Sequence, residues 1–334
     1  MRAWLVERLG PPAEVLRLAE VPEPEVQPGT VKIQVEAAAL NFLDILLCLG
    51  QYQERPPLPF TPGAEVAGTV VEAGPGSSYR VGDRVVALPV LPQGGFAERV
   101  VVPEERVYPV APGMPPDDAA AFLIAFHTAD YALRHRAGLR PGEVLLVHAG
   151  AGGVGSAAIQ LGVAMGARVL ATAGGAEKVE RCRRLGAERA IDYREEDFVE
   201  AVKEATGGRG ADVIFDPVGG DVFDRSRRCV APEGRILVIG FAGGGIPQIP
   251  ANHVLVKNYT VVGIHWGYRA RLDPAAVRSD HRHLLDLYQR QAIRPVIYRR
   301  YPFTGLVEAL GDLAGRRSYG KLVLQGATPD GSPG

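Results

Sequence analysis

Over residues 1–110 the apolar positions form short runs that proline and glycine clusters interrupt, such as Pro56-Pro57-Leu58-Pro59 and Gly74-Pro75-Gly76. Runs of this length are typical of β-strands joined by turns. Together they indicate a compact, partly open β-barrel. The predicted strands are residues 31–39, 64–73, 82–88 and 96–102.

From about residue 118, patterns of helical period alternate with short apolar runs of strand length. Alternation on this scale is typical of a doubly wound parallel sheet, so we predict an α/β fold. The predicted helices are residues 118–137, 156–165, 176–185, 195–206 and 221–230. The predicted strands between and after them are residues 143–148, 168–173, 189–193, 211–215, 234–240 and 259–265.

The C-terminal part of the chain changes pattern again after about residue 267. It predicts, in order, helix 274–291, strand 294–304, helix 304–314 and strand 321–325. We expect this part to return to the N-terminal domain. The first domain would then consist of residues 1–122 and 267–334, the second of residues 123–266, with a cleft between them.

The predicted strand 143–148 runs directly into a glycine-rich turn and then into an apolar helix beginning near Ser156. Gly150, Gly152 and Gly155 have the spacing G-x-G-x-x-G, in which glycines allow a tight turn and a close approach to a pyrophosphate. The N-terminus of the following helix favours that anion. The motif and its context predict a dinucleotide site.

The residues after strand 168–173 indicate which dinucleotide binds. A site selective for NAD carries an acid at the end of this strand, to hold the ribose 2′-hydroxyl. Here the chain has Ala173, Gly174 and Gly175, and Lys178 follows where a 2′-phosphate needs a cation. The alternative is that Lys178 is only a solvated residue in the first turn of the next helix. The pattern favours NADPH over NADH.

Composition narrows the class of protein. With 334 residues, 46% of them hydrophobic, the chain can bury two cores. Its net charge of −1 offers no electrostatic attraction to nucleic acid or membrane surfaces. The three cysteines are too scattered for a disulfide framework, and neither a signal peptide nor a membrane-spanning apolar run is evident. We therefore expect a cytoplasmic protein.

Motifs spread over nearly the whole chain resemble, in order, those of the medium-chain dehydrogenase/reductase superfamily. Within it the closest resemblance is to the zinc-independent quinone oxidoreductases related to ζ-crystallin. This resemblance implies a GroES-like, β-rich catalytic domain and a Rossmann domain that binds NADPH. The matching segments are residues 41–44, 58–68, 82–85, 94–98, 148–155, 185–187, 216–219 and 320–321.

The resemblance also implies that the chain works without zinc. Zinc-dependent relatives bind the metal through Cys, His and a further Cys, where this chain has Asn41, Ala64 and Ile124. A catalytic zinc needs three protein ligands around an open position. Without a Lewis acid, alcohol oxidation loses the means to stabilise an alkoxide, which favours reduction of an electron-poor acceptor.

Four residues are implied to line the reaction site. Asn41 and Asp44 would lie on the nicotinamide side with Thr128 nearby, and Tyr52 would form an aromatic wall for the acceptor. The alternatives are a turn residue for Asn41, a helix-start residue for Asp44 and a helix-interior hydroxyl for Thr128.

The resemblance assigns further residues to the phosphates of the cofactor. Gly153 and Val154 would lie under the pyrophosphate, and Gly174, Lys178 and Tyr193 would surround the 2′-phosphate. The alternative for Tyr193 is an ordinary aromatic residue at the end of a strand.

Residues nearer the C-terminus are assigned to both ends of the cofactor. Phe241 and Ala242 would flank the nicotinamide ribose, and His265 and Trp266 would approach the nicotinamide. Two basic residues would either add charge to the phosphate site or face solvent without a role; they are Arg316 and Lys321.

These assignments predict an NADPH-dependent reductase that passes hydride to a quinone in the interdomain cleft. One alternative is a reductase of enoyl or other α,β-unsaturated carbonyl compounds, which would need a positioned proton donor such as Tyr52 or His265. Another is a non-catalytic NADPH-binding protein of the crystallin kind. The family implies a homodimer, joined through strand 234–240 or 259–265 at the edge of the cofactor-domain sheet.

Overall fold

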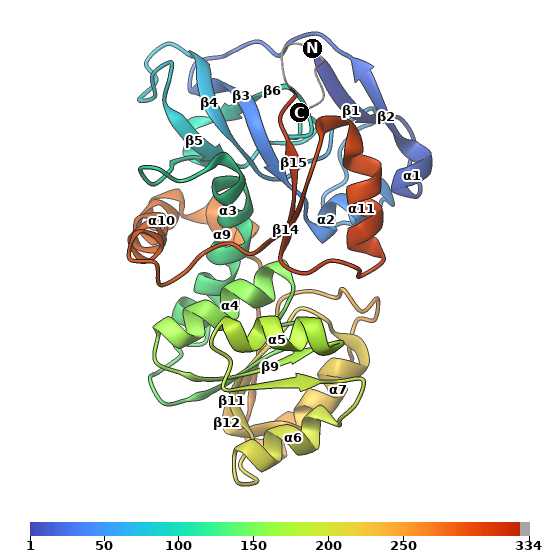
Figure 1. Cartoon of the computed structure of the whole chain (residues 1–334), viewed down its shortest axis with the longest axis vertical. Helices are drawn as coiled ribbons and strands as arrows, with labels where there is room; N and C mark the ends of the chain where they lie inside the picture. The colour runs from blue at the N-terminus through green and yellow to red at the C-terminus, as the bar shows by residue number, and fades with distance from the viewer. Residues whose placement is uncertain (328–334) are drawn as a thin grey trace. The chain divides into compact units, whose positions relative to one another are not determined.

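A computed structural model describes residues 1–327 and divides the chain into two compact units (Figure 1). The first unit comprises Met1–Ile124 and Val296–Gly334, and the second is the continuous segment Ala125–Pro295. Residues 267–295, which we expected in the first domain, therefore pack with the second unit. Residues 328–334, which close our first domain, lie outside the described part.

The first unit is β-rich. Its large sheet has the order β14-β15-β3-β4-β5-β7, with β6 also paired to β3, and strands β1 and β2 form a separate antiparallel pair. Buried and half-buried positions alternate along most of β3, as expected for a strand with one face on a core. The strands are β1 Arg2–Val6, β2 Leu16–Glu20, β3 Thr30–Ala39, β4 Val66–Ala73, β5 Arg84–Ala87, β6 Arg99–Pro103, β7 Val107–Pro109, β14 Ile297–Tyr301 and β15 Lys321–Gln325.

Three short α-helices accompany these strands, α1 (Pro12–Val15), α2 (Phe42–Cys48) and α11 (Leu306–Ala314), with two 3-10 helices, η1 (Glu104–Arg106) and η3 (Phe303–Gly305). The hairpin of β1 and β2 and the helix α2 were not predicted, because these segments are short and carry no clear alternation of apolar and polar residues. The remaining strands confirm the predicted β-rich character of this unit.

The second unit contains a six-stranded, wholly parallel sheet of order β10-β9-β8-β11-β12-β13. The chain builds outward from β8 to β10 and then returns to build from β11 to β13, which is the doubly wound order. This confirms the predicted fold class. The strands are β8 Val144–Val147, β9 Arg168–Ala173, β10 Arg189–Asp192, β11 Ala211–Asp216, β12 Val230–Val238 and β13 Thr260–Gly263.

The helices that accompany this sheet include two that were not predicted, α8 and α9. Helix α6 begins three residues later than predicted, because the Asp197 carboxylate accepts a hydrogen bond from the N–H of Val199 at 2.8 Å and caps the helix there. The helices are α3 Pro116–Asp130, a π-helix η2 Tyr131–Arg136, α4 Gly153–Ala164, α5 Ala176–Arg184, α6 Phe198–Ala205, α7 Gly220–Cys229, α8 Ala251–Lys257, α9 Trp266–Leu272 and α10 Pro274–Gln289.

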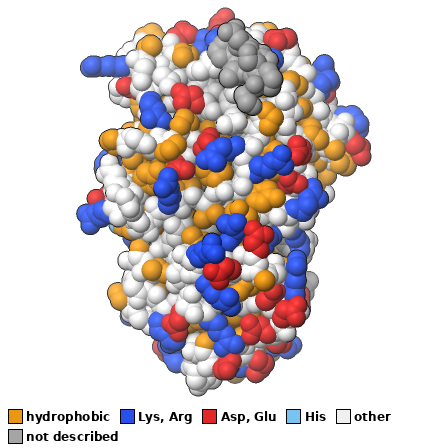
Figure 2. All heavy atoms as spheres, viewed as in Figure 1, with side chains coloured by type: hydrophobic (Ala, Val, Ile, Leu, Met, Phe, Trp, Pro, Cys, Tyr) orange, Lys and Arg blue, Asp and Glu red, His pale blue; other side chains and the backbone are white. Residues whose placement is uncertain are grey.

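Acidic and basic side chains are interspersed over the face shown in Figure 2, as the nearly balanced composition leads one to expect. Within residues 1–327, no helix has both the length and the hydropathy needed to cross a membrane.

Candidate cofactor and acceptor site

The parallel sheet of the second unit brings most of the predicted cofactor residues to one edge. All six strands point the same way, so the loops after them emerge together at their carboxyl ends, where doubly wound sheets bind ligands. These residues follow β8 (Gly150, Gly152, Gly153, Val154, Gly155), β9 (Gly174), β10 (Tyr193), β12 (Phe241, Ala242) and β13 (His265, Trp266).

The glycine turn after β8 is tight and closely packed. Ala149 has a φ of 49°, in the left-handed region, and the N–H of Gly150 donates to the Thr172 carbonyl at 2.9 Å. A β-carbon at Gly155 would overlap the Ala149 carbonyl oxygen, so this position requires glycine. The close packing of α4 against the turn is therefore enough to require the last glycine of the motif.

Helix α4 begins at Gly153, three residues before the predicted start, so the turn and the helix overlap. The first N–H groups of an α-helix have no partner within the helix. Those of Gly153, Val154 and Gly155 are therefore suited to an anion at the helix N-terminus. The arrangement fits a dinucleotide pyrophosphate.

A buried histidine supports this turn from below. His148 lies between the Thr172 hydroxyl, 3.0 Å from Nδ1, and the Ser226 hydroxyl, 2.8 Å from Nε2. Because the Ser226 hydroxyl donates to the Val222 carbonyl, Nε2–H is the donor to Ser226, and Nδ1 accepts from Thr172. Burial lowers the pKa of His148 to about 3, with Arg225 adding to the effect. The imidazole is therefore neutral and joins β8, β9 and α7.

The turn after β9 is built around two glycines and an aspartate. The Asp192 carboxylate accepts from the N–H of Gly175 at 3.0 and 3.1 Å and from the N–H of Arg194 at 3.1 Å. Gly175 has a φ of 91°, which favours glycine. A β-carbon at Gly174 would overlap the Tyr193 hydroxyl, so that phenol lies directly over the turn. Asp192 thus organises the backbone of this turn.

Two cations lie close to the same turn. Lys178 is half-buried in the first turn of α5, and Arg194 is exposed, with its guanidinium within 3.4 Å of where β-carbons of Gly174 and Gly175 would stand. Sequence reasoning missed Arg194, although a basic residue directly after Tyr193 was a signal. With Tyr193, these side chains form a surface suited to a phosphate.

The loop after β12 packs on the turn that follows β11. The N–H of Ala242 donates to the Pro217 carbonyl at 3.1 Å, and the ring of Phe241 lies against Gly219. In the β11 turn the Asp216 carboxyl accepts from the N–H of Gly219 at 3.0 Å, and burial raises its pKa. These contacts hold Phe241 and Ala242 at the carboxyl edge.

His265 and Trp266 have structural roles after β13. Nδ1 of the exposed His265 accepts from the N–H of Tyr268 at 2.8 Å, which caps α9. Trp266 is buried, with its ring 4.9 Å from that of His127, which in turn bonds His281 at 2.9 Å. The expected approach of Trp266 to the nicotinamide stays a prediction.

In the first unit, Asn41 belongs to a buried polar cluster. Its Nδ2 donates to Glu65 Oε1 at 2.9 Å, and its Oδ1 accepts from Lys321 Nζ at 2.6 Å. Lys321 Nζ also lies 2.7 Å from Glu65 Oε1, and Glu65 Oε2 accepts from the N–H of Ile124 at 2.8 Å. Sequence reasoning missed Glu65, which stands directly before β4.

The position of Lys321 corrects one prediction. We expected a solvent-facing residue or one that adds charge to the phosphate site, yet its side chain is only 6% exposed. Its ammonium is held by Glu65 and Asn41 because Lys321 opens β15 beside the end of β3. Arg316 is exposed after α11 and has a φ of 53°. Its contribution of charge to the phosphate site stays a prediction.

Asp44 is fully buried near this cluster, in the first turn of α2. Its carboxyl accepts from the N–H of Asn41 at 2.8 Å and from the N–H of Gly63 at 3.2 Å. Burial raises the pKa of Asp44 to about 7, although the two N–H groups and Lys321 oppose the rise. The carboxyl thus fixes the backbone around Asn41.

Tyr52 and Thr128 are both half-buried. Tyr52 packs against an apolar cluster in the first unit, and its place beside the acceptor stays a prediction. Thr128 lies in α3, one helical turn after Ile124. The cluster beneath Tyr52 consists of Val6, Val15, Leu47, Cys48 and Phe60.

Comparison with known proteins agrees with this geometry. A family described as "Zinc-binding dehydrogenase" matches residues 153–281, and one described as "Alcohol dehydrogenase GroES-like domain" matches residues 27–112. The "Quinone oxidoreductase-like protein 2 homolog" of Nematostella vectensis is 41% identical over 298 residues, covering 88% of this chain and 81% of that protein.

The "Quinone oxidoreductase-like protein 2" of Bos taurus is 39% identical over 312 residues, covering 92% of this chain and 88% of that protein. This chain belongs to the quinone oxidoreductase-like family of the medium-chain dehydrogenases/reductases. Among solved structures of the family, Escherichia coli quinone oxidoreductase complexed with NADPH is 29% identical, with a TM-score of 0.90 over 97% of this chain and 100% of that one.

Zinc is the metal that the name of the matching dehydrogenase family implies, and the residues present do not fit it. The Asn41 amide is held on both sides, Ala64 has no donor, and Ile124 offers only its backbone N–H, already bonded to Glu65. Of the two carboxyl groups nearby, Glu65 is paired with the ammonium of Lys321, and Asp44 accepts hydrogen bonds from the N–H groups of Asn41 and Gly63. A catalytic zinc needs three free nitrogen, sulfur or oxygen ligands.

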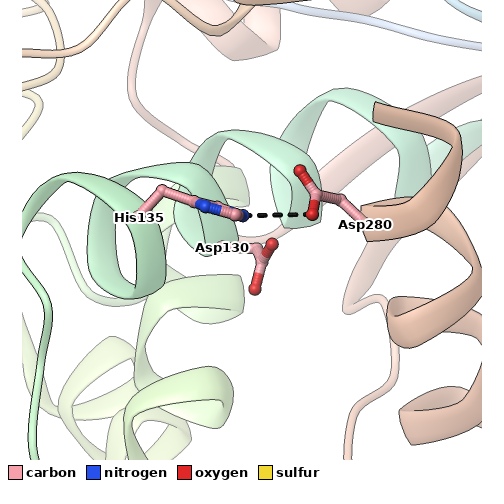
Figure 3. Close-up of side chains that lie close together, drawn as sticks. All are labelled: Asp130, His135 and Asp280. Atoms are coloured by element: carbon pink, nitrogen blue, oxygen red, sulfur yellow. Dashed lines mark hydrogen bonds and ion pairs between the residues drawn. The ribbon is translucent and has the colours of Figure 1, made fainter. Parts of the chain in front are cut away.

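A second cluster in this medium-chain fold has the residue types of a metal site. Figure 3 shows Asp130, His135 and Asp280 converging from α3, η2 and α10, with His135 Nε2 3.0 Å from Asp280 Oδ1. The guanidinium of Arg134, however, donates to Asp130 at 2.6 Å and to Asp280 at 2.8 Å. The two carboxylates are therefore already balanced, and the cluster is an ion-pair network that fastens α10 to the π-helix.

Proposed function

We propose that this chain is a zinc-independent, NADPH-dependent reductase that passes hydride to a quinone. The observation that carries the choice of NADPH is the turn at Gly174–Gly175, beside which Lys178, Tyr193 and Arg194 gather. The nearest acid, Asp192, is engaged with backbone N–H groups and not free for a ribose 2′-hydroxyl. The relatives' names and the NADPH complex of the E. coli protein support the same reading.

In this proposal the second unit binds the cofactor and the first supplies acceptor-side residues. The N–H groups at the start of α4 hold the pyrophosphate, and Lys178, Tyr193 and Arg194 hold the 2′-phosphate. The nicotinamide side of the site is lined by Asn41 and Asp44, with Thr128 nearby. NADPH, when bound, supplies the hydride. Tyr52 offers its ring face to the acceptor, and water protonates the resulting hydroquinone anion.

Two further proposals concern context. A homodimer through the edge of the second sheet is supported by β13, which pairs only with β12 among the described strands, and by the exposed apolar residues Ile246, Leu255 and Val256 nearby. A cytoplasmic location is supported by three buried cysteines that are free thiols.

The direct test measures NADPH oxidation against a panel of quinones, enones and enoyl thioesters. We expect quinones to give the highest kcat/KM. Faster turnover of enones or enoyl thioesters would replace the proposal with an enoyl-type reductase. NADPH binding by calorimetry without turnover of any acceptor would point to a non-catalytic NADPH-binding protein.

A further inference from the structure

Three neighbouring strands of the first unit bring a lysine, a glutamate and an asparagine to one point. Asn41 follows the end of β3, Glu65 precedes β4 and Lys321 opens β15, and β3 lies between the other two strands in the sheet. Backbone bonds fix this junction, since the N–H of Leu40 donates to the Leu322 carbonyl at 2.9 Å. The juxtaposition is therefore built into the sheet.

The charges of Glu65 and Lys321 balance each other without any group from outside the protein. Glu65 is fully buried and accepts bonds on both oxygens, while the ammonium of Lys321 lies within 2.7 Å of both Glu65 and Asn41. A buried carboxylate left without a cation would be strongly destabilising. The ammonium supplies, beside the residues that replace zinc ligands, the positive charge that a metal would bring.

The same contacts determine which way the Asn41 amide points. Its Oδ1 accepts from the Lys321 ammonium, which can only donate, and its Nδ2 donates to the Glu65 carboxylate, which can only accept. Nδ2 also makes a longer bond to the Ala39 carbonyl at 3.3 Å. Rotating the amide by half a turn would set NH2 against NH3⁺ and oxygen against carboxylate. Only one orientation is compatible with the ion pair.

We propose that Lys321, paired with Glu65, takes the place of a metal cation at this point and is the positioning residue that fixes Asn41 for hydride transfer. The proposal rests on the proposed reductase function. Its effect on the reaction passes through Asn41, since hydride transfer tolerates little misalignment. Neither family resemblance nor the phosphate site assigns Lys321 this role.

The test compares Lys321→Met, Glu65→Gln, the double variant and Lys321→Arg. Lys321→Met should lower both Tm and kcat with a quinone, kcat by about 10- to 100-fold, while the Kd for NADPH changes by less than about threefold. The double variant removes both charges and should recover Tm but not kcat. Lys321→Arg, which keeps the charge, should recover part of kcat.

A matched control is Lys32→Met, on β3 of the same sheet, where Lys32 Nζ lies 2.6 Å from the exposed Glu72. It should leave kcat unchanged. The proposal is wrong if the double variant regains kcat together with Tm, because Lys321 would then only balance charge. A folded Lys321→Met protein with wild-type kcat would also overturn it.

A readout without turnover separates this proposal from the proposed function. The side-chain amide of Asn41, assigned in NMR spectra by Asn41→Ala, should exchange slowly with solvent in the wild type. In the double variant, which stays folded, it should shift and exchange faster. An unchanged Asn41 amide would refute the positioning role even in an active enzyme, whereas failure of every acceptor would refute only the reductase.

Discussion

At the scale of single residues, the proposed preference for NADPH depends on two basic side chains beside one glycine turn. A charge-assisted hydrogen bond contributes about 1.5–3 kcal/mol, or roughly 10- to 100-fold in affinity. Lys178→Ala and Arg194→Ala should each weaken NADPH binding by about this factor and leave NADH binding nearly unchanged. Calorimetry with both dinucleotides measures the effect.

The control for this comparison is Arg184→Ala, which removes an exposed cation from the same helix, paired with Glu180 at 3.1 Å. It should change neither affinity by more than about twofold, because screened surface charges act weakly at a distance. Equal affinities of the wild type for NADPH and NADH would contradict the assignment of the 2′-phosphate site.

Proton donation is the second question at this scale. A hydroquinone anion is protonated by water, so Tyr52→Phe should change kcat by well under 10-fold, whereas general acid catalysis contributes about 10²–10⁴-fold. His265→Gln should act mainly on stability, by about 1 kcal/mol, because it removes the cap of α9. Steady-state kinetics decides: a loss above about 100-fold in kcat with KM unchanged would indicate an enoyl-type reductase.

At the scale of elements, the neutral His148 joins β8, β9 and α7 beside the glycine turn after β8. Its pKa is about 3 in the folded protein and about 6.5 in an unfolded chain, so the unfolded state binds the proton first as pH falls. This histidine therefore lowers the free energy of unfolding as pH falls from about 6.5 towards 3, by up to about 1.4 kcal/mol per pH unit.

The variant His148→Asn tests this directly. It should be less stable than the wild type at pH 7, because it loses buried hydrogen bonds. The difference should narrow as the pH falls, since the variant has no proton to take up at this position. Urea unfolding at several pH values measures the gap, with the exposed His283→Asn as a control. A gap that does not depend on pH would show that His148 does not titrate in this way.

Elements with strong periodicity could be predicted from the sequence. Strand β9 has the predicted bounds 168–173, because five apolar or small residues follow Arg168 and the strand lies between two glycine turns. Helix α8, with seven residues and its apolar Leu255 and Val256 exposed, has no amphipathic signal to find. The hydrophobic pattern of a segment shows which of its residues are buried within the element. It does not predict an element whose apolar residues are exposed, as in α8.

The same limit applies to the candidate site. Gly150 to Gly155 could be recognised because a short motif carries its own geometry. Glu65 could not, since its role comes from a strand far away in the sequence, whereas Arg194 was overlooked although it directly follows Tyr193. Lys321 was misplaced for this reason: it lies 256 residues from its partner Glu65, and only the order of the sheet brings them together.

At the scale of the whole molecule, the side of β13 that no strand within residues 1–327 pairs with, and the exposed apolar residues near it, predict self-association. Leu255→Asp combined with Val256→Asp should turn a dimer into a monomer, because it places charge on an otherwise apolar surface. Light scattering coupled to size exclusion measures the mass. Val81→Asp, at an exposed apolar position of the first unit, should leave the dimer intact. A wild-type monomer at micromolar concentration would refute the dimer.

Metal content is also a property of the whole protein. Elemental analysis of the purified chain should find no stoichiometric zinc, and chelators should leave quinone reduction unchanged, because Glu65 is paired with Lys321 and the other positions offer no ligand. A tightly bound zinc that is lost together with activity would contradict both the zinc argument and the reaction class.

The order of synthesis affects the two units differently. The second unit is one continuous segment, Ala125–Pro295, and can fold as it leaves the ribosome. The first unit must wait for the last part of the chain, since β15 lies between β14 and β3, and Trp4 Nε1 donates to the Phe303 carbonyl at 2.9 Å. Until then Glu65 has no cation, so a nascent chain stalled before Val296 presents an unfinished sheet to chaperones and proteases.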